Sequence, residues 1–300
     1  MPDPGPGHHR HRAGGRFVLA GGGLHGPDGP ERGVPQPPDR GGAAMSSNGL
    51  RPVLTSEWIK VRSTSGTITS LPLGVAISFA LAYLGGLSTG SAIDNDSPML
   101  MPDFNPINSG FNGLLYGNLA FVVFAVLVFS SEYTSGMIHT SLSAVPQRGL
   151  LYFSKIAVVG VICLVVGGLT AFGSFVATQA ALGSHGVDLS TPGVTRALIG
   201  AVAYVTLLGV FSAAVGALLR STALALGLLM PLFFVVSPAL GTIAGTRPVG
   251  RFLPDQAGIQ AMRVTVEPGQ LTQTQGLTVL VIWTVGVVAL GYWMIRQRDA

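Results

Sequence analysis

Residues 156–187 read IAVVGVICLVVGGLTAFGSFVATQAALGSHGV, a stretch of 32 residues without Asp, Glu, Lys or Arg. A helix needs about 20 apolar residues to cross the hydrocarbon core of a bilayer, so this stretch holds one span and is too short for two. Five other uncharged stretches have at least 23 residues, whereas the next longest has only 15. The chain is therefore predicted to be an all-α polytopic membrane protein with six transmembrane helices. The other five stretches are residues 63–93, 104–131, 197–219, 221–246 and 268–295.

Charged residues make up only 10% of the 300 residues, against roughly 25% in an ordinary soluble domain. This scarcity excludes a soluble enzyme, and the scattered basic residues form no patch for nucleic acid. An outer-membrane barrel would show alternating segments of about ten residues instead of long uniform runs. The predicted spans are residues 67–88, 112–131, 155–182, 197–218, 221–243 and 276–296.

Several residues inside the spans predict local features. Gly113 and Gly117 form a GxxxG pair in the second span, and small residues let helices approach closely in lipid. We interpret this pair, and the single cysteine Cys163 in the third span, as packing residues within the chain. Pro231 and Pro238 remove helix hydrogen bonds from the fifth span. The fifth span is therefore predicted to be kinked or broken.

The first 44 residues differ from the rest of the chain. They contain 12 Gly and 8 Pro and show neither helical nor strand periodicity. Such a segment buries too little surface to offset its ordering entropy, so residues 1–44 are predicted to be a disordered tail. Met45 offers a second start, and residues 45–300 then form the membrane domain. The histidines at positions 8, 9 and 11 are assigned no metal, because nothing in the tail fixes them.

Six spans place both termini on one side of the membrane, and the distribution of Lys and Arg indicates the cytoplasm. With this orientation the inner segments after residue 44 hold eight basic residues and the outer loops hold four. In the last outer loop Asp255 and Glu267 are expected to oppose three arginines. The inner eight are Arg51, Lys60, Arg62, Arg148, Lys155, Arg220, Arg296 and Arg298.

The sequence lacks the groups that membrane catalysis and ion coupling require. No span contains an ionisable group at membrane depth, where ion-coupled transporters and proton pumps need one. Outside the tail only His139 and His185 exist, both near the predicted membrane surfaces, so an intramembrane hydrolase is not expected. Neither Lys60 nor Lys155 follows a glycine, which excludes a G-x-x-x-x-G-K-[ST] phosphate loop. The chain is not predicted to be an enzyme, and the energy for any uphill transport must come from another chain.

The segment before the first span, LTSEWIKVR at residues 54–62, has the pattern of an amphipathic helix. Leu54, Trp58 and Val61 share one face of this helix. The helix is predicted to lie on the inner leaflet, and the alternative is a generic juxtamembrane anchor. The charged residues that lie largely away from the apolar face are Glu57, Lys60 and Arg62.

The loop between the second and third spans reads EYTSGMIHTSLSAVPQR at residues 132–148. Ile138 and Leu142 are four residues apart, so a short helix in this loop would present a small apolar face. Pro146 ends that helix, because the residue before a proline is pushed out of the α region. A short helix between two membrane helices is suited to mechanical contact with a partner, and the alternative is a solvated connector.

Four segments resemble the type 2 permease (ABC-2) family of ATP-binding-cassette exporters. The pattern E-Y-x-x-G-x-I-x-x-x-L-x-x-x-P-x-R-x-x-x-x-x-x-K, from Glu132 to Lys155, is similar to a loop of its membrane subunits. The run S-E-W-I-K-V-R-S at residues 56–63 is similar to its N-terminal elbow helix. The run F-L-P-x-x-A-G-x-x-A at residues 252–261 and the closing R-Q-R-D-A resemble actinobacterial members. The resemblance covers residues 50–300.

The resemblance implies the permease subunit of an exporter in the bacterial cell membrane, with a cytoplasmic coupling helix between helices two and three. It also implies a second permease half, identical or different, and two cytoplasmic ATPases that bind ATP and Mg²⁺. Closure of the ATPases would push on the coupling loop and the elbow helix, and so switch the pair between inward-open and outward-open states. The implied coupling residues are Glu132, Tyr133, Gly136, Ile138, Leu142, Pro146 and Arg148, with Glu57, Trp58, Lys60 and Arg62 in the elbow helix.

In this family helices two and five face the translocation path, which gives a set of candidate path residues. For each of them the alternative role is packing. An apolar path with a few amides and aromatic rings is compatible with lipids, hydrophobic drugs or peptides. The candidates are Asn112, Tyr116, Asn118, Phe121, Phe124, Met230, Phe233 and Phe234.

Two further expectations concern single residues. Glu132 is the only acid in the inner loops between the spans, so we predict that it pairs with Lys60 or Arg62. Pro254 suits the first turn of a short helix through Met262, which would dip into the outer leaflet or cover the exit of the path. Alternative functions for the whole chain are a non-transporting membrane scaffold or sensor and a passive channel.

Overall fold

The computed structural model describes residues 50–63, 65–95, 104–134, 148–243 and 245–297, which form helices and turns without strands. Six helical segments are long and apolar enough to cross a membrane. The predicted all-α architecture with six spans is confirmed, and each predicted span coincides with one of these segments. The tail at residues 1–44 lies outside the described residues. The six segments are Thr69–Asp94, Pro106–Tyr133, Arg148–His185, Val194–Leu219, Thr222–Thr242 and Gln273–Gln297.

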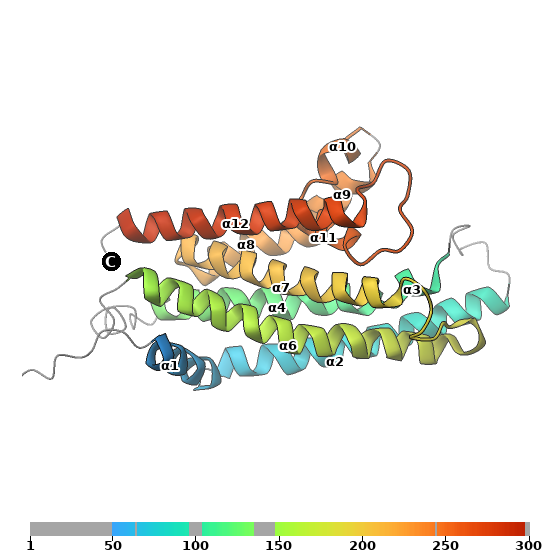
Figure 1. The fold of residues 1–300 in the computed structure, drawn as a ribbon, viewed down its shortest axis with the longest axis horizontal. Coiled ribbons are helices and arrows are strands. Elements are labelled where there is room, and N and C mark those ends of the chain that lie inside the picture. Colours follow the sequence, from blue (N-terminus) through green and yellow to red (C-terminus); the bar gives the residue numbers. More distant parts are fainter. Residues whose placement is uncertain (1–49, 64, 96–103, 135–147, 244, 298–300) are drawn as a thin grey trace, which may run out of the picture. The chain divides into compact units, whose positions relative to one another are not determined.

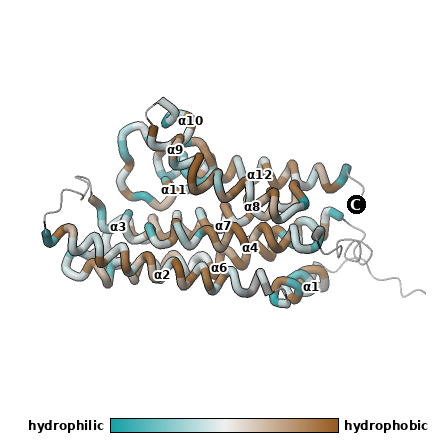
Figure 2. Tube along the Cα trace, turned by 180° about the vertical axis from the view of Figure 1, so that it is seen from behind, coloured by the Kyte–Doolittle hydropathy of each residue, from teal (hydrophilic) through white to brown (hydrophobic). Residues whose placement is uncertain are grey.

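The long helices run side by side, and three short helices gather at the end of the bundle that is remote from the first helix (Figure 1). Hydrophobic residues line the long helices over most of their length, whereas polar residues concentrate near their ends (Figure 2). The long helices are α2 (Ser65–Asp94), α4 (Asn112–Thr134), α6 (Arg148–Leu182), α7 (Val194–Leu219), α8 (Thr222–Pro231) and α12 (Gln273–Gln297), and α1 (Leu50–Ser63) lies at an angle to them at one end of the bundle (Figure 1). The short elements are α3 (Pro106–Ser109), η1 (Gly183–His185), η2 (Leu232–Val236), α9 (Ser237–Thr242), α10 (Arg247–Gly250) and α11 (Pro254–Gln260).

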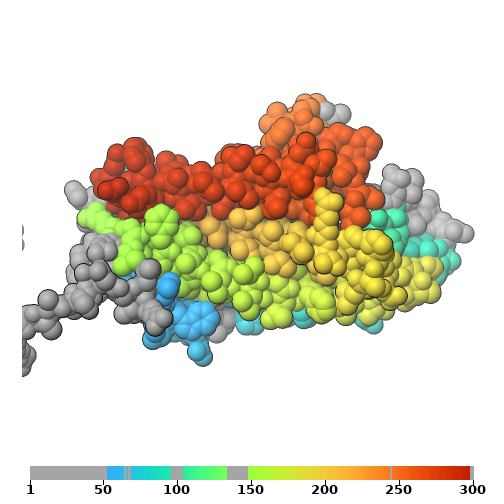
Figure 3. All heavy atoms as spheres, in the orientation of Figure 1, coloured from blue at the N-terminus to red at the C-terminus, as the bar shows by residue number. Residues whose placement is uncertain are grey.

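The centre of the bundle is formed by α4 and α7. Of their most apolar windows 67% and 61% are buried within the chain, whereas the value for α12 is only 17%. Accordingly, α12 lies as an outer ridge on one face of the molecule (Figure 3). Phe121 and Phe124 of α4 and Leu208 of α7 are fully buried in the core between the helices. The outer helices therefore keep large apolar surfaces for lipid or for other subunits.

Close packing of α4 on α2 explains the GxxxG pair. A Cβ atom at Gly113 would fall 2.5 Å from the backbone nitrogen of Ala82, and one at Gly117 would overlap the hydroxyl of Ser78. Only glycine permits this approach of two helix backbones, as expected for helices associating in lipid. The interpretation as packing within the chain is confirmed, and Cys163 is likewise buried in the core.

The third span begins at Arg148, seven residues before the predicted start at Lys155. The prediction treated Lys155 as a marker of the membrane surface, because a charged residue inside a span is costly. In the structure Lys155 lies two helical turns inside α6 and is buried. Its charge is tolerated there because two carboxylates bind it, as described below.

The fifth span is broken at its two prolines. The α-helical segment α8 ends at Pro231, a π-helical turn follows from Leu232 to Val236, and α9 begins at Ser237. A proline provides no N–H for the preceding turn, so the backbone widens locally to satisfy its carbonyls. The predicted interruption is confirmed. The predicted short helix after Pro254 is also present, as α11.

Candidate functional site

The buried face of α1 differs from the predicted one. Val53, Glu57 and Val61, each four residues from the next, face the bundle and are at most 9% exposed. Trp58, predicted to share the apolar face, is 44% exposed. The expectation that Glu57 points away from the apolar face is therefore wrong. A carboxylate can take a buried position only if cations compensate its charge.

Glu57 and three other charged side chains form a closed ring of ion pairs. Lys60 Nζ lies 2.8 Å from Glu57 Oε1 and 3.0 Å from Glu132 Oε1. Lys155 Nζ lies 2.7 Å from Glu132 Oε1 and also donates to Glu57 Oε2. Each lysine thus bridges both glutamates. We call Glu57, Lys60, Glu132 and Lys155 the charge ring, and it joins α1, the end of α4 and α6.

The charge ring is electrically balanced and mostly removed from solvent. Glu57, Glu132 and Lys155 are at most 4% exposed, whereas the side chain of Lys60 is 35% exposed. Burial lowers the pKa of Lys60, but hydrogen bonds and charge attraction from Glu57 and Glu132 outweigh this effect and hold its pKa above the ordinary value. The predicted contact of Glu132 with Lys60 is confirmed. Arg62 takes no part in the ring.

The end of α4 is also held from the opposite side. Ser130 accepts a hydrogen bond of 2.7 Å from the hydroxyl of Thr222, the first residue of α8. The guanidinium of Arg220, which ends α7 in a left-handed conformation, lies 5.2 Å from the centre of the Tyr133 ring. The helix ends that flank the loop at residues 132–148 are therefore fixed to α1 on one side and to the α7–α8 turn on the other.

The predicted coupling residues lie at these two helix ends and in the sequence between them. Glu132 and Tyr133 end α4, and Arg148 begins α6. The structure thus brings Glu132 together with two of the predicted elbow residues, Glu57 and Lys60. The role of the loop in coupling stays a prediction. The positions that lie outside the described residues are Gly136, Ile138, Leu142 and Pro146.

The candidate path residues are distributed over buried and exposed positions. Phe121, Phe124 and Phe233 are buried, and the amide of buried Asn118 donates to the hydroxyl of Tyr204 at 3.2 Å. The role of all eight residues in a path stays a prediction. Met230 is half-buried, and the exposed ones are Asn112, Tyr116 and Phe234.

A second polar cluster lies at the break of the fifth span. The hydroxyl of Ser237, the first residue of α9, donates to Oδ1 of Asp255 in α11, and the side chain of Gln256 donates to Oδ2 at 3.0 Å. Asp255 is buried, and burial raises its pKa above the ordinary value. The expectation that Asp255 opposes the outer arginines is wrong. Among the described acids it is Glu267 that does so, at 3.1 Å from Arg247 and 3.0 Å from Arg263.

The raised pKa of Asp255 predicts a pH-dependent stability. The folded chain binds this proton more tightly than the unfolded chain, so stability falls as the pH rises from about 3.8 through the folded pKa. Asp255→Asn removes this dependence and is expected to be more stable than wild type at neutral pH. Thermal unfolding of both proteins between pH 4 and 8 measures the difference. Asp188→Asn, at an exposed carboxyl, is the control, and equal slopes for all three proteins would contradict the prediction.

Comparison with known families agrees with the arrangement of spans and loops. A family model described as an ABC-2 family transporter protein matches residues 53–244, nearly two thirds of the chain. The chain belongs to the ABC-2 transporter family. No curated protein matches it significantly. The family match begins within α1 and ends just after α9, so it contains all four residues of the charge ring.

Membership of the ABC-2 family makes this chain a multi-pass membrane protein and a component of an ABC transporter. Sequence reasoning had placed Lys155 at the membrane surface and gave it no part in the site. A signal for its role was present, because a lysine is almost never fully buried unless it is paired. On the predicted inner side after residue 44, the two acids before the third span are Glu57 and Glu132. In this ABC-2 chain the carboxylates of Glu57 and Glu132 bind Lys155.

Proposed function

We propose that this ABC-2 protein is the permease subunit of an ATP-driven exporter in the bacterial cell membrane, with both termini in the cytoplasm. Two ATPase subunits bind ATP and Mg²⁺, and a second permease half completes the translocation path. The family match and the excess of Lys and Arg on the proposed inner side support this assignment. The alternatives, a scaffold or a passive channel, would not depend on ATP hydrolysis.

The charge ring is the observation that carries this proposal. Glu132 precedes the loop at residues 135–147. Lys155 lies about 10 Å along α6 from its first residue, Arg148, given a rise of about 1.5 Å per residue. A force applied to the loop therefore acts on α4 and α6 together. Because Glu57 of α1 binds Lys155 and Lys60 of α1 binds Glu132, α1 must follow. The three helices are suited to move as one unit when the ATPases close.

The path is proposed to run between the two permease halves, on surfaces that this chain leaves exposed. Tyr116 of α4 is 56% exposed, and Phe234 lies next to the π-helical turn at the break of the fifth span. A broken helix is able to change its geometry with less loss of hydrogen bonds than a straight one. Aromatic and amide groups on an apolar surface suit an amphipathic or hydrophobic substrate. Export of such a substrate is the proposed activity.

The coupling role of the loop is tested with Leu142→Asp. A carboxylate on the apolar face of the proposed coupling helix should reduce the ATPase activity that co-purifies with the tagged full chain by at least tenfold. Such a loss corresponds to about 1.4 kcal/mol of contact energy. Thr140→Asp introduces the same charge on the opposite face and should retain the partner.

Transport itself is tested with the complex in proteoliposomes. Efflux or uptake of a hydrophobic reporter should require ATP and should stop in the Leu142→Asp protein. Flux without ATP would indicate a channel, and absence of any ATP-hydrolysing partner from the wild-type preparation would support a scaffold. Either result would overturn the proposal.

A further inference from the structure

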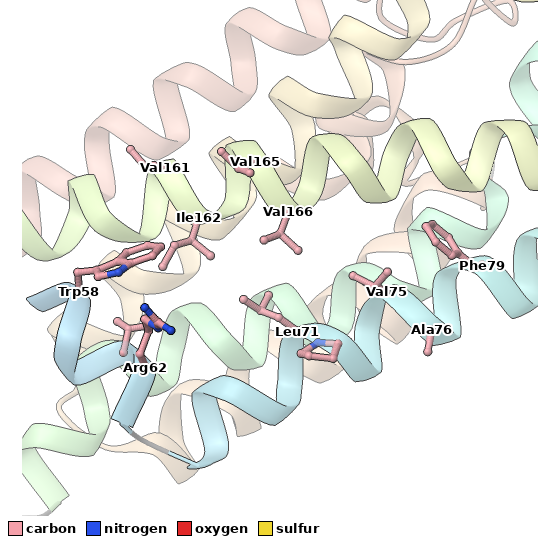
Figure 4. A pocket seen from close by; sticks show the side chains of 12 residues that line it. Trp58, Arg62, Leu71, Val75, Ala76, Phe79, Val161, Ile162, Val165 and Val166 are labelled. Carbon is pink, nitrogen blue, oxygen red and sulfur yellow. The ribbon is translucent and has the colours of Figure 1, made fainter.

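An apolar groove lies between α2 and α6 on the side of the bundle that carries α1 (Figure 4). Its volume is about 840 Å³. Leu71, Val75 and Phe79 of α2 form one wall, and Val161 and Val165 of α6 form the other. In the close-up, Ile162 and Val166 of α6 point toward Leu71 and Val75 of α2 across the open space (Figure 4). Of the described residues that line the groove, Arg62 is the one that carries a charge, and the two walls are apolar.

One end of the groove is closed by direct contact of the two helices. The ring of Phe79 packs on Gly173 so closely that no side chain would fit there. Beyond this point the hydroxyl of Thr178 donates to the carbonyl of Ala82 at 3.1 Å. Toward α1 the helices diverge, and the space between them widens. The groove is therefore a wedge whose open end lies at α1.

The open end carries Trp58 and Arg62, which lie close together in the close-up view (Figure 4). Among the residues that the structure describes, Arg62 has no acidic partner, because the neighbouring carboxylates Glu57 and Glu132 are bound within the charge ring. An arginine beside a tryptophan is typical of the membrane–water interface. The mouth of the groove is thus positively charged and amphipathic.

Two other arginines at the same end of the bundle are engaged with aromatic rings. Arg220 lies over Tyr133, and the guanidinium of Arg296 lies 5.5 Å from the centre of the Tyr292 ring. Among the described residues Arg62 makes no such contact with an aromatic ring, and it lines the groove. Its charge is available to an external anion.

The depth of the groove corresponds to one leaflet. The wall from Leu71 to Phe79 covers eight residue steps, or about 12 Å along α2. This is less than half of the hydrocarbon core of about 30 Å. An empty space of this size within a membrane is costly, because its lining loses van der Waals partners. An apolar occupant would restore these contacts, and the positive charge of Arg62 at the mouth suits an anionic head group.

We propose that this groove binds an anionic phospholipid of the leaflet at the α1 end, with one acyl chain between α2 and α6 and the phosphate on Arg62. Trp58 then lies beside the glycerol region. The bound lipid fills the wedge and ties α1 to the two membrane helices that it touches. The proposal requires only that the six helices span a membrane, and it does not depend on ATPase partners or on transport.

The experiment compares full-length chains in nanodiscs of phosphatidylcholine mixed with phosphatidylglycerol, by native mass spectrometry of the retained lipid. Wild type should retain phosphatidylglycerol in preference to phosphatidylcholine. Arg62→Gln should lower this preference about fivefold, the effect expected for one basic residue at a membrane surface. Arg296→Gln removes a similar charge at the same end of the bundle and should leave the preference unchanged. An equal preference in wild type and Arg62→Gln would overturn the proposal.

The acyl-chain site is tested separately by filling the groove. Val165→Trp and Ala76→Trp place a large ring in the groove from opposite walls, and both positions are exposed, so the fold should tolerate them. Each should reduce retention of both lipids, whereas Ile282→Trp on the exposed surface of α12 should not. Unchanged retention in both groove variants would show that lipid binds elsewhere. Cross-linking of two copies through Val165→Cys would assign the groove to a second copy and reject the lipid.

Discussion

Lys155→Met is expected to lower the free energy of unfolding by about 3–5 kcal/mol, the usual cost of removing one partner from a buried ion pair. Lys155 is 3% exposed and binds both Glu57 and Glu132, so its loss removes one ammonium group from both buried carboxylates. Methionine keeps a long apolar stem, so the change removes charge with little change in packing. Thermal unfolding of the detergent-solubilised chain, followed by size-exclusion chromatography, measures the effect.

Two variants make this expectation specific. Lys60→Met removes the same charge from the same ring, but the side chain of Lys60 is 35% exposed and water replaces part of its contribution. Lys60→Met should therefore lower the free energy of unfolding clearly less than Lys155→Met does. The triple variant with Glu57→Gln, Glu132→Gln and Lys155→Met carries no uncompensated carboxylate and should recover much of the stability. Equal losses for Lys155→Met and Lys60→Met would show that burial of Lys155 is not what matters.

The membrane architecture was predictable because a bilayer imposes a simple rule on the chain. Each uncharged stretch of 23 residues or more became one span, since charge is costly in hydrocarbon wherever it lacks partners. The break of the fifth span at Pro231 and Pro238 followed equally directly from the missing N–H groups. The number of spans and this break depend on local chemistry alone, whereas the start of the third span depends on the tertiary contacts of Lys155.

The site was less predictable because its charged residues lie at buried positions, where the sequence of a single helix would not place them. Glu57 occupies a buried position on α1 and Lys155 lies two turns inside α6, and each is stable there only because of the other. They are 98 residues apart in sequence, so no periodicity within one helix reveals the contact. Asp255 was misassigned for the same reason, since its partner Ser237 belongs to another helix. Only the predicted pairing of Glu132 with Lys60 was found in advance, from the scarcity of acids on that side.

Glu132→Lys is expected to be at least as damaging as Lys155→Met, because the new lysine would face the ammonium groups of Lys60 and Lys155. A loss of about 3–5 kcal/mol is the lower bound, since repulsion adds to the loss of the ion pairs. The usual rescue, a second change of Lys60→Glu, should fail in this protein. In the ring each lysine touches both glutamates, so exchanging one neighbouring pair leaves two contacts between like charges.

Inversion of all four charges is the arrangement that restores every contact. A chain with Glu57→Lys, Lys60→Glu, Glu132→Lys and Lys155→Glu again has opposite charges at all four contacts, and it should unfold at a higher temperature than either Glu132→Lys or the double variant. The difference in side-chain length limits the recovery to a part of the wild-type stability. If the double variant with Lys60→Glu is rescued as well as the fourfold one, the contacts act as independent pairs. The ring would then not be the unit that joins α1 to α4 and α6.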